Sequence, residues 1–427
     1  MTKKSDAPAI RFKGFSDAWE QRKFDEVFDC TVPNNTLSRA ELSYDEGTVL
    51  NVHYGDVLIK YGSVLDVQKD DIPRIPHRCR EDFNGALLQD GDVIIADTAE
   101  DETTGKACEI GNLQGSAIVS GLHTMVCRPR NRMALGYLGY YLNSNAYHHQ
   151  LLPLMQGIKV LSLSRSNIQK TSVSYPIAVK EQQLIAYYFR QLDNLITLHQ
   201  RKFEKLTNVK KSMLEKMFPQ NGSSYPEIRF KGFTDPWEQR KLGDIADIVG
   251  GGTPSTGNQS YWDGDIDWYA PAEIADQIYA NSSQKKITGL GYENSSAKML
   301  PPGTVLFTSR AGIGKTAILT RKGCTNQGFQ SIVPHRGELD SYFIFSRTEE
   351  LKRYGELVGA GSTFVEVSGK QMAVMELMMP PTMREQQTIG GFFQQLDHLI
   401  TLHQRKPFLM KWRTSDANRN QTNRLVL

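Results

Sequence analysis

Residues 181–218 carry the clearest hydrophobic pattern in the chain, because apolar side chains recur there every seven residues. The stretch contains no proline or glycine, and eight of its ten seam positions are apolar. This pattern predicts a long helix with a narrow coiled-coil stripe, about 57 Å long at about 1.5 Å per residue. Pro219 and the turn residues after it end the helix. The seam positions are Ile185, Leu192, His199, Leu206 and Met213 in one set, and Phe189, Ile196, Phe203, Lys210 and Met217 in the other.

Two segments of the sequence occur twice. Residues 10–23 return as residues 228–241 with twelve of fourteen identical, and residues 191–202 return as residues 395–406 with one difference in twelve. The material between the copies has little identity, which is typical of a constant frame that holds two variable modules. The repeat predicts a pseudo-twofold arrangement in which the two helices pair antiparallel. The alternative is that each helix packs on its own domain, but the long and narrow seam favours pairing.

The two copies of the helix differ at their ends. After residue 406 the second copy continues with Pro407, which has no N–H and would cost about 3 kcal/mol inside a helix. We therefore expect the second helix to end or kink at about Lys406. In an antiparallel pair the missing half would leave four apolar residues of the first helix uncovered, unless residues 408–412 fold back over them. The four residues are Ile185, Phe189, Leu192 and Ile196.

The stretches between the repeats predict a mixture of strands and helices. Short β-branched runs between turn residues indicate strands at residues 49–62, 91–100, 303–319 and 330–334, and helical patterns follow late in each module. The predicted fold class is α+β, with two globular domains and long repeat helices that form an antiparallel coiled coil. The predicted segments are an arm at 1–23, a first module at 24–176, a central helix at 177–220, a second arm at 221–241, a second module at 242–380, a distal helix at 381–406 and a divergent tail at 407–427.

Composition narrows the function classes only slightly. The formal net charge of +3 is too small to indicate nucleic acid by itself, so any basic surface must be local. No apolar run approaches the roughly 18 residues that span a bilayer, and the chain starts without a signal-peptide stretch, which predicts a cytoplasmic protein with no membrane partner. The five cysteines are scattered and form no CxxC, so neither a disulfide framework nor a zinc site is indicated.

A glycine-rich loop in the second module carries candidate chemistry. Residues 309–316, SRAGIGKT, end like a P-loop, but Ser309 stands where a phosphate-cradling loop needs glycine. Nucleotide hydrolysis is therefore not favoured. The loop could instead present backbone N–H groups, Arg310 and Lys315 to a phosphate backbone or to base edges. A solvated hairpin turn remains the alternative.

A second loop, residues 250–262, is rich in hydroxyl groups and leads into aromatic residues. Thr253 and Ser255 could donate hydrogen bonds to a polyanion, whereas burial beneath the loop is favoured for the aromatic residues. His199 recurs as His403, and helix packing is favoured over metal binding because carboxylate or thiol partners are lacking nearby. The sequence contains no GxSxG, HExxH or Asn/Asp-Pro-Pro-aromatic motif. The chain is therefore predicted to bind a ligand and not to catalyse a reaction.

An ordered series of motifs runs through the second module: GGTPST, YWDGDIDW, PPGTVLFTSRAGIGKTAI, TNQGFQSIVP and GAGSTFVEVSGKQM. Fainter counterparts occur in the first module, where GDVIIADTAED corresponds to GTVLFTSRAG and GIKVLSLSRSNI to GSTFVEVSGKQM. The series resembles the specificity subunit of type I restriction-modification systems, and the resemblance extends from residue 10 to residue 406.

The resemblance implies a non-catalytic DNA-specificity subunit. Each variable module would be a target-recognition domain for one half of a split double-stranded DNA site. The repeat helices would hold the modules apart and dock methyltransferase subunits, and motor-nuclease subunits would join for restriction. No cofactor or metal is expected in this chain, while S-adenosylmethionine, ATP and magnesium are expected in the partner subunits. The implied docking positions are Ile185, Phe189, Leu192, Ile196, Phe203, Leu206, Leu396 and Leu399.

The family motifs also mark loops whose polar and cationic residues are the expected DNA contacts. In the second module these residues are Thr253, Ser255, Arg310, Lys315, Asn326 and Gln327. In the first module they are Lys60, Tyr61, Asp97, Lys106 and His123.

Two other functions remain open at this stage. An autonomous DNA-modifying enzyme would need cofactor and catalytic motifs that the sequence lacks. A two-module scaffold on a coiled coil, binding a partner other than nucleic acid, would be distinguished by the absence of salt-dependent DNA binding.

Overall fold

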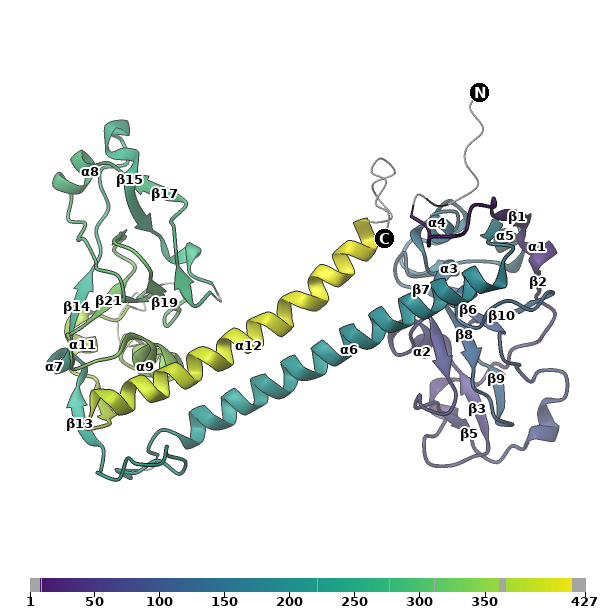
Figure 1. Ribbon diagram of the computed structural model, residues 1–427, viewed down its shortest axis with the longest axis horizontal. Coiled ribbons are helices and arrows are strands. Elements are labelled where there is room, and N and C mark those ends of the chain that lie inside the picture. Colours follow the sequence, from purple (N-terminus) through teal and green to yellow (C-terminus); the bar gives the residue numbers. More distant parts are fainter. Residues whose placement is uncertain are drawn as a thin grey trace. The chain divides into compact units, whose positions relative to one another are not determined.

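The structure is a computed structural model that describes residues 8, 10–220, 222–275, 277–310, 312–360 and 366–416, with side chains described as far as Gln404. The chain divides into two compact units, Met1–Leu198 with Lys406–Leu427, and His199–Arg405. Each unit contains sheets and helices, so the predicted α+β class is confirmed (Figure 1). Within the described residues, no helix is both long enough and apolar enough to cross a membrane.

A five-stranded sheet forms the centre of the first unit. Its strand order is β2-β10-β6-β8-β4, and only the β4–β8 pair is parallel. Alternate residues of β6 face opposite sides: Val93 and Ile95 pack in one apolar cluster, and Ile94 and Ala96 pack in another. The sheet is therefore covered on both faces. The strands are β2 Phe28–Asp29, β4 Val64–Asp66, β6 Val93–Ala96, β8 Ala107–Gly111 and β10 Thr124–Pro129.

The second unit contains a five-stranded sheet with the same arrangement. Its order is β14-β21-β18-β19-β16, and again only the last pair, β16–β19, is parallel. The predicted correspondence between GDVIIADTAED and GTVLFTSRAG is confirmed, because β6 and β18 occupy the same central position. The strands are β14 Ala246–Gly250, β16 Tyr279–Ala280, β18 Val305–Phe307, β19 Thr316–Leu319 and β21 Gln330–Pro334.

A smaller sheet accompanies each large one. The orders are β5-β3-β9 and β17-β15-β20, and in both the middle strand runs antiparallel to the first neighbour and parallel to the second. The modules share this topology although their sequences diverge, so the internal repeat extends through them. The strands are β3 Val49–Val52, β5 Arg74–Ile75 and β9 Ala117–Ser120, and β15 Trp262–Tyr269, β17 Lys285–Ile287 and β20 Cys324–Thr325.

Short helices complete the two modules. The Ser164 side chain caps α5 by accepting the Asn167 N–H, and Ser368 caps α11 by accepting the Gln371 N–H, which confirms the predicted match of these two motifs. In the first module the helices are α1 Phe24–Val27, α2 Tyr54–Ile59, α3 Tyr137–Leu142, α4 Asn145–His148 and α5 Arg165–Ile168, with a two-stranded sheet of β7 Thr98–Ala99 and β11 Leu161–Ser162. In the second they are α7 Leu242–Ile245, α8 Gly289–Glu293, α9 Ser341–Ser346, α10 Thr348–Gly359 and α11 Gly369–Ala373.

The repeated segments 10–23 and 228–241 make the same contact in both units. Arg229 donates two hydrogen bonds to the Glu385 carboxylate, at 2.8 and 2.9 Å, and Trp237 Nε1 donates a third at 3.2 Å. In the first unit Arg11 and Trp19 bind Glu181 in the same way, at 2.6, 2.8 and 3.4 Å. Each arm then continues into a strand that closes a two-stranded sheet, β1 Glu20–Lys23 with β12 Ser172–Tyr175, and β13 Glu238–Lys241 with β22 Glu376–Met379.

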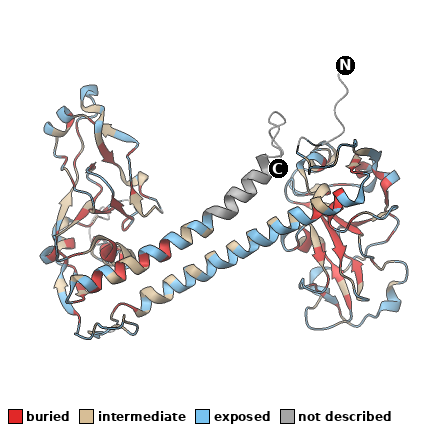
Figure 2. Cartoon of the chain, viewed as in Figure 1, coloured by how far each residue is buried: buried red, intermediate tan, exposed pale blue. Residues whose placement is uncertain are grey.

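The predicted heptad register of the first long helix is confirmed. Helix α6, Val179–Lys216, begins and ends two residues before the predicted helix. Between residues 191 and 210 its only positions that are not exposed are the six seam positions, and Figure 2 shows the remainder of this stretch exposed to solvent. They are Leu192, Ile196, His199, Phe203, Leu206 and Lys210.

Within the second unit, α6 packs against α12 in the antiparallel direction. His199 Nδ1 lies 2.7 Å from His403 Nδ1, and Lys210 Nζ lies 2.5 Å from Asp397 Oδ1, so ascending positions on α6 meet descending positions on α12. The polar seam residue Lys210 is explained by this ion pair, because Asp397 is almost fully buried. The expected helix packing of His199 is also confirmed.

Two expectations about local structure were wrong. Helix α12 spans Met383–Asp416 and so continues past Lys406 and Pro407. A single missing N–H therefore does not end the helix, whereas the alternative of a kink at about Lys406 stays a prediction. The side chains that would cover or expose the apolar stripe lie outside the described residues. The predicted strand at residues 49–62 ends at Val52, because the His53 side chain accepts the Gly55 N–H and caps helix α2.

Candidate nucleic-acid interface

The turn between β20 and β21 gathers three of the predicted contact residues. Asn326 donates its backbone N–H to the carbonyl of the last residue of β15 at 3.0 Å, and its Oδ1 accepts the Gly328 N–H at 2.8 Å. These bonds close the turn and leave Gln327 exposed. Thr253 Oγ1 donates to Gln327 Oε1 at 2.6 Å. The structure therefore brings Thr253, Asn326 and Gln327 together at one surface.

The loop that carries Thr253 approaches this turn through a glycine. A Cβ added to Gly251 would lie 2.0 Å from the Asn326 carbonyl oxygen, so any larger residue would push the loop away. Trp268 is buried beneath the loop and donates its Nε1–H to a loop carbonyl at 2.8 Å. Ser255 is exposed, and its carbonyl accepts the indole N–H of Trp262, which is half-buried. The predicted burial of the aromatic residues is thus complete for Trp268 and partial for Trp262.

The loop containing GIGKT connects β18 to the antiparallel strand β19. A phosphate-cradling loop connects a strand to a helix, so the topology agrees with rejecting nucleotide hydrolysis. The Thr308 hydroxyl accepts the Lys315 N–H at 2.9 Å and closes the loop. A Cβ on Gly314 would lie 2.4 Å from Lys352 Cβ on α10, so this glycine permits close packing.

Arg310 and Lys315 are exposed on the same loop. Arg310 Nε lies 2.9 Å from Glu366 Oε1, and the arginine side chain keeps 52% of its surface exposed. The residue before it, Ser309, donates its N–H to the Gly328 carbonyl at 2.8 Å. This bond joins the loop directly to the turn that presents Gln327.

The first module builds a corresponding turn between β9 and β10. Gly121 donates its N–H to the Val52 carbonyl at 2.9 Å, as Asn326 does to the end of β15. Asp97 donates its N–H to the His123 carbonyl at 3.1 Å, as Ser309 does to Gly328. The two modules therefore hold equivalent turns, 121–123 and 326–328, on equivalent strand ends.

Four polar or aromatic side chains meet at the first-module turn. Asp97 Oδ1 accepts from Thr98 Oγ1 at 2.8 Å and lies 3.3 Å from His123 Nδ1. The Tyr54 ring meets the His123 ring edge-to-face with centroids 5.3 Å apart. His123 is held with φ 54°, and its side chain is 47% exposed. This cluster offers hydrogen-bond donors, acceptors and an aromatic face to a ligand.

Two of the predicted first-module contacts are structural residues. Tyr61 is 3% exposed, and burial raises the pKa of its hydroxyl well above the ordinary value. Lys106 Nζ donates to the carbonyls of Leu58 and Tyr61 at 2.8 and 3.2 Å, and burial lowers its pKa. Both residues therefore complete the C-terminal end of α2. Lys60 lies nearer the surface, where its ammonium is 2.8 Å from Asp71 Oδ2.

Sequence reasoning missed several residues beside the first-module turn. Asn35 Nδ2 donates to Asn51 Oδ1 at 2.6 Å and to the Ser120 carbonyl at 2.9 Å, and Asn34 Nδ2 donates to the Gly121 carbonyl at 3.2 Å. Tyr54 was missed as well. The available signal was positional, because at the offset of the repeated arms Asn35 corresponds to Thr253.

The implied docking residues have several different environments. Ile185 packs against the apolar core of the first unit, and Leu396 is buried in that of the second, so these two stabilise the chain itself. Phe189 stacks on Tyr140 with centroids 5.4 Å apart. Leu192, Ile196, Phe203 and Leu206 are half-buried, and Leu399 is 40% exposed.

Comparison with known proteins agrees with this geometry. Residues 16–208 and 234–408 match the family described as the type I restriction modification DNA specificity domain. The chain belongs to this family. It carries two DNA-specificity domains, and its role is DNA-sequence specificity within a restriction-modification complex, without catalysis of its own.

Individual relatives of this specificity family match to different extents. The type I restriction enzyme MjaIX specificity subunit of Methanocaldococcus jannaschii is 36% identical over 167 residues, which are 38% of each chain. The putative MjaX specificity subunit of the same organism is 24% identical over 404 residues, 91% of this chain and 89% of the relative. The crystal structure of the type I S subunit from M. genitalium has a TM-score of 0.61 at 10% identity, covering 96% of this chain and 97% of that chain.

Proposed function

We propose that the turns at residues 121–123 and 326–328 contact base edges, so that each module recognises one half of a bipartite DNA target. The observation that carries this proposal is the equivalent placement of two turns with unrelated side chains, His123 with Asp97 beside it in one module and Gln327 in the other. Carboxylate, imidazole and amide groups pair with different donor and acceptor patterns in the major groove. Two modules of one topology can therefore select two unrelated half-sites.

The second part of the proposal assigns the long helices to the docking of methyltransferase subunits. From residue 195 of α6 onward, and at residues 399 and 402 of α12, aliphatic side chains outside the seam are exposed, with 36–48% of the surface of each residue accessible. Single exposed apolar residues are common on protein surfaces, but their recurrence on each of the two repeat helices would offer a partner apolar surface to cover. The exposed residues are Leu195, Leu198, Val209, Leu399 and Leu402.

The chemistry in this proposal belongs to the partners. Methyltransferase subunits would flip an adenine out of each half-site and methylate it from S-adenosylmethionine. Motor-nuclease subunits would use ATP and magnesium for restriction. The residues of this chain determine which adenines are presented.

Equilibrium DNA binding tests the proposal directly. The full chain, purified alone and with its methyltransferase subunit, should bind a duplex containing the target more tightly than a scrambled duplex. Its affinity should fall linearly in log–log form as salt rises, because phosphate contacts release counterions. A scaffold for a different kind of partner would show neither behaviour, and that result would remove the DNA function.

A further inference from the structure

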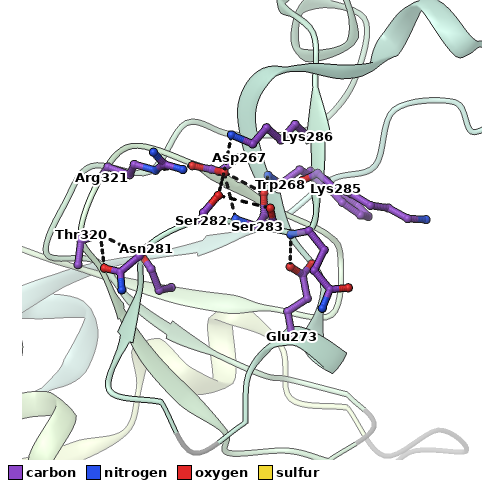
Figure 3. A network of polar contacts seen from close by, with 12 residues as sticks. Asp267, Trp268, Glu273, Asn281, Ser282, Ser283, Lys285, Lys286, Thr320 and Arg321 are labelled. Atoms are coloured by element: carbon purple, nitrogen blue, oxygen red, sulfur yellow. Dashed lines mark hydrogen bonds and ion pairs between the residues drawn. The ribbon is translucent and has the colours of Figure 1, made fainter. Parts of the chain in front are cut away.

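A buried carboxylate in the second module is surrounded by hydrogen-bond donors (Figure 3). Asp267, on β15, is 3% exposed. Its Oδ1 accepts from the Ser283 N–H at 3.0 Å, the Ser283 hydroxyl at 3.1 Å and the Ser282 hydroxyl at 3.2 Å. Burial by itself would raise its pKa, but the two Ser283 donors and Arg321 outweigh burial and lower the pKa of Asp267. The carboxylate is therefore held in its charged form.

Two cations from separate elements converge on this carboxylate. Arg321, in the connection between β19 and β20, places Nε 2.6 Å from Asp267 Oδ2. Lys286, on β17, places Nζ 3.5 Å from Oδ1. Their side chains remain 50% and 36% exposed, although both approach a buried group. The three side chains together carry one net positive charge at the protein surface.

The fold of the module does not require this charged group. Leu50 in β3 occupies the position that Asp267 has in β15. Leu50 pairs with Arg74 as Asp267 pairs with Lys286, and each lies two residues before the last residue of its strand, which pairs with the parallel neighbour. The first module therefore builds the same small sheet around a leucine. A buried ion pair is also weak evidence for stability, since desolvation offsets much of the attraction. In the second module the carboxylate orders both residues 282–283 and the two cations.

The cation pair lies beside the turn assigned to base contact. Asp267 precedes Tyr269 by two residues, about 7 Å along a strand, and the Tyr269 carbonyl accepts the Asn326 N–H. One nucleotide step is about 3.4 Å along a DNA strand, so these two strand positions are about two nucleotide steps apart. Arginine has five N–H donors, and the ion pair with Asp267 is made through Nε.

We propose that Arg321 and Lys286, positioned by Asp267, bind the phosphate backbone of the DNA beside the turn at 326–328. This inference rests on the proposed DNA function and adds a contact that fixes position without selecting sequence. The first module keeps a cation at the equivalent strand position, Arg74, but lacks the carboxylate that would position it. The positioned phosphate site is therefore particular to the second module.

Salt-dependent binding of the full chain to its target duplex tests this site. Each lost phosphate contact reduces the slope of log affinity against log salt by about 0.9. When salt rises from 50 to 200 mM, the fold-loss of affinity of Arg321→Gln should therefore be smaller than that of the wild type by a factor of about 3.5. For Arg321→Gln with Lys286→Gln the factor should be about 12. Preference for the target over substituted duplexes should not change, because phosphate contacts do not distinguish bases.

Arg240→Gln provides a matched control. Arg240 is an exposed arginine paired with a carboxylate, Glu338, at 3.0 Å. It lies on β13, at the far end of the unit from β15 and β17 (Figure 1). The control should keep the wild-type slope. The phosphate site is refuted if Arg321→Gln and the double variant match Arg240→Gln in both affinity and slope.

Asp267→Asn separates positioning from simple charge attraction. The substitution removes a negative charge, so unpositioned attraction predicts tighter binding to DNA. The proposed site predicts weaker binding, because Arg321 and Lys286 lose the group that orders them. Tighter binding by this variant would overturn the positioning role. A wild-type chain that fails to bind its duplex would instead count against the proposed DNA function itself.

Discussion

Removal of the Glu385 carboxylate should destabilise the second unit by about 3 kcal/mol. Glu385 is 1% exposed and binds both Arg229 and the indole N–H of Trp237, which is itself buried. Removing one partner of a buried ion pair costs about 3–5 kcal/mol, because the other charge stays buried without compensation. Since Arg229 keeps 13% of its side-chain surface exposed, Glu385→Ala is expected at the lower end of that range.

Urea unfolding and hydrogen exchange measure this effect together. In Glu385→Ala the second unit should unfold at a lower urea concentration. Hydrogen exchange should accelerate in the arm, residues 228–241, because the Glu385 carboxylate binds it. Glu338→Ala is the matched control, because the Arg240–Glu338 pair is exposed on both sides. Exposed pairs contribute about 0–1 kcal/mol. Glu181→Ala should produce the same local effect on residues 10–23 of the first unit.

The difference in unfolding free energy between Glu385→Ala and Glu338→Ala shows whether the ion pair holds the arm. If Glu385→Ala costs no more than Glu338→Ala, the arm is held by its strand pairing and the repeated ion pair is incidental. A loss of protection confined to the substituted helix, with the arm unchanged, would lead to the same conclusion.

Further predictions concern the loop of the second module and the core of the first. If Arg310 contacts a base, Arg310→Ala should cost about 1–3 kcal/mol of binding and relax preference at one position, whereas Lys315→Ala should weaken all sequences alike; unchanged binding profiles for both would remove the loop from the interface. Burial raises the pKa of the Glu109 carboxyl from 4.5 to about 7. The folded state therefore holds this proton more tightly, and the stability it contributes below pH 4.5 should be lost as pH rises through 7, by about 3 kcal/mol. Glu109→Gln should flatten the dependence of first-unit stability on pH in that window; an unaltered slope would mean that other groups cause it.

Periodic features of the fold were predictable because they depend on local spacing. The seven-residue register identified every half-buried position from Leu192 to Lys210. The equivalence of Leu50 and Asp267 was not predictable, because strand pairing and not residue type relates them. The prediction of a strand over residues 49–62 failed because a β-branched pattern does not reveal that His53 caps a helix.

Single site residues were harder to predict than elements. Lys106 resembles a ligand-binding cation in the sequence, but two backbone carbonyls use its ammonium. Tyr61 was chosen as polar and is part of the core. Thr253, Asn326 and Gln327 stay predicted DNA contacts; the structure brings them together, and their mutual contacts depend on strand ends that are distant in sequence.

Two modules of one topology and different surface residues should recognise their half-sites independently. The most direct measurement is the map of methylated adenines after residues 242–380 are replaced by the corresponding module of another family member, in the complete complex with its methyltransferase subunit. We expect that one half of the methylated target changes and that the other half keeps its sequence. A change in both halves, or in neither, would contradict independent recognition by the two modules.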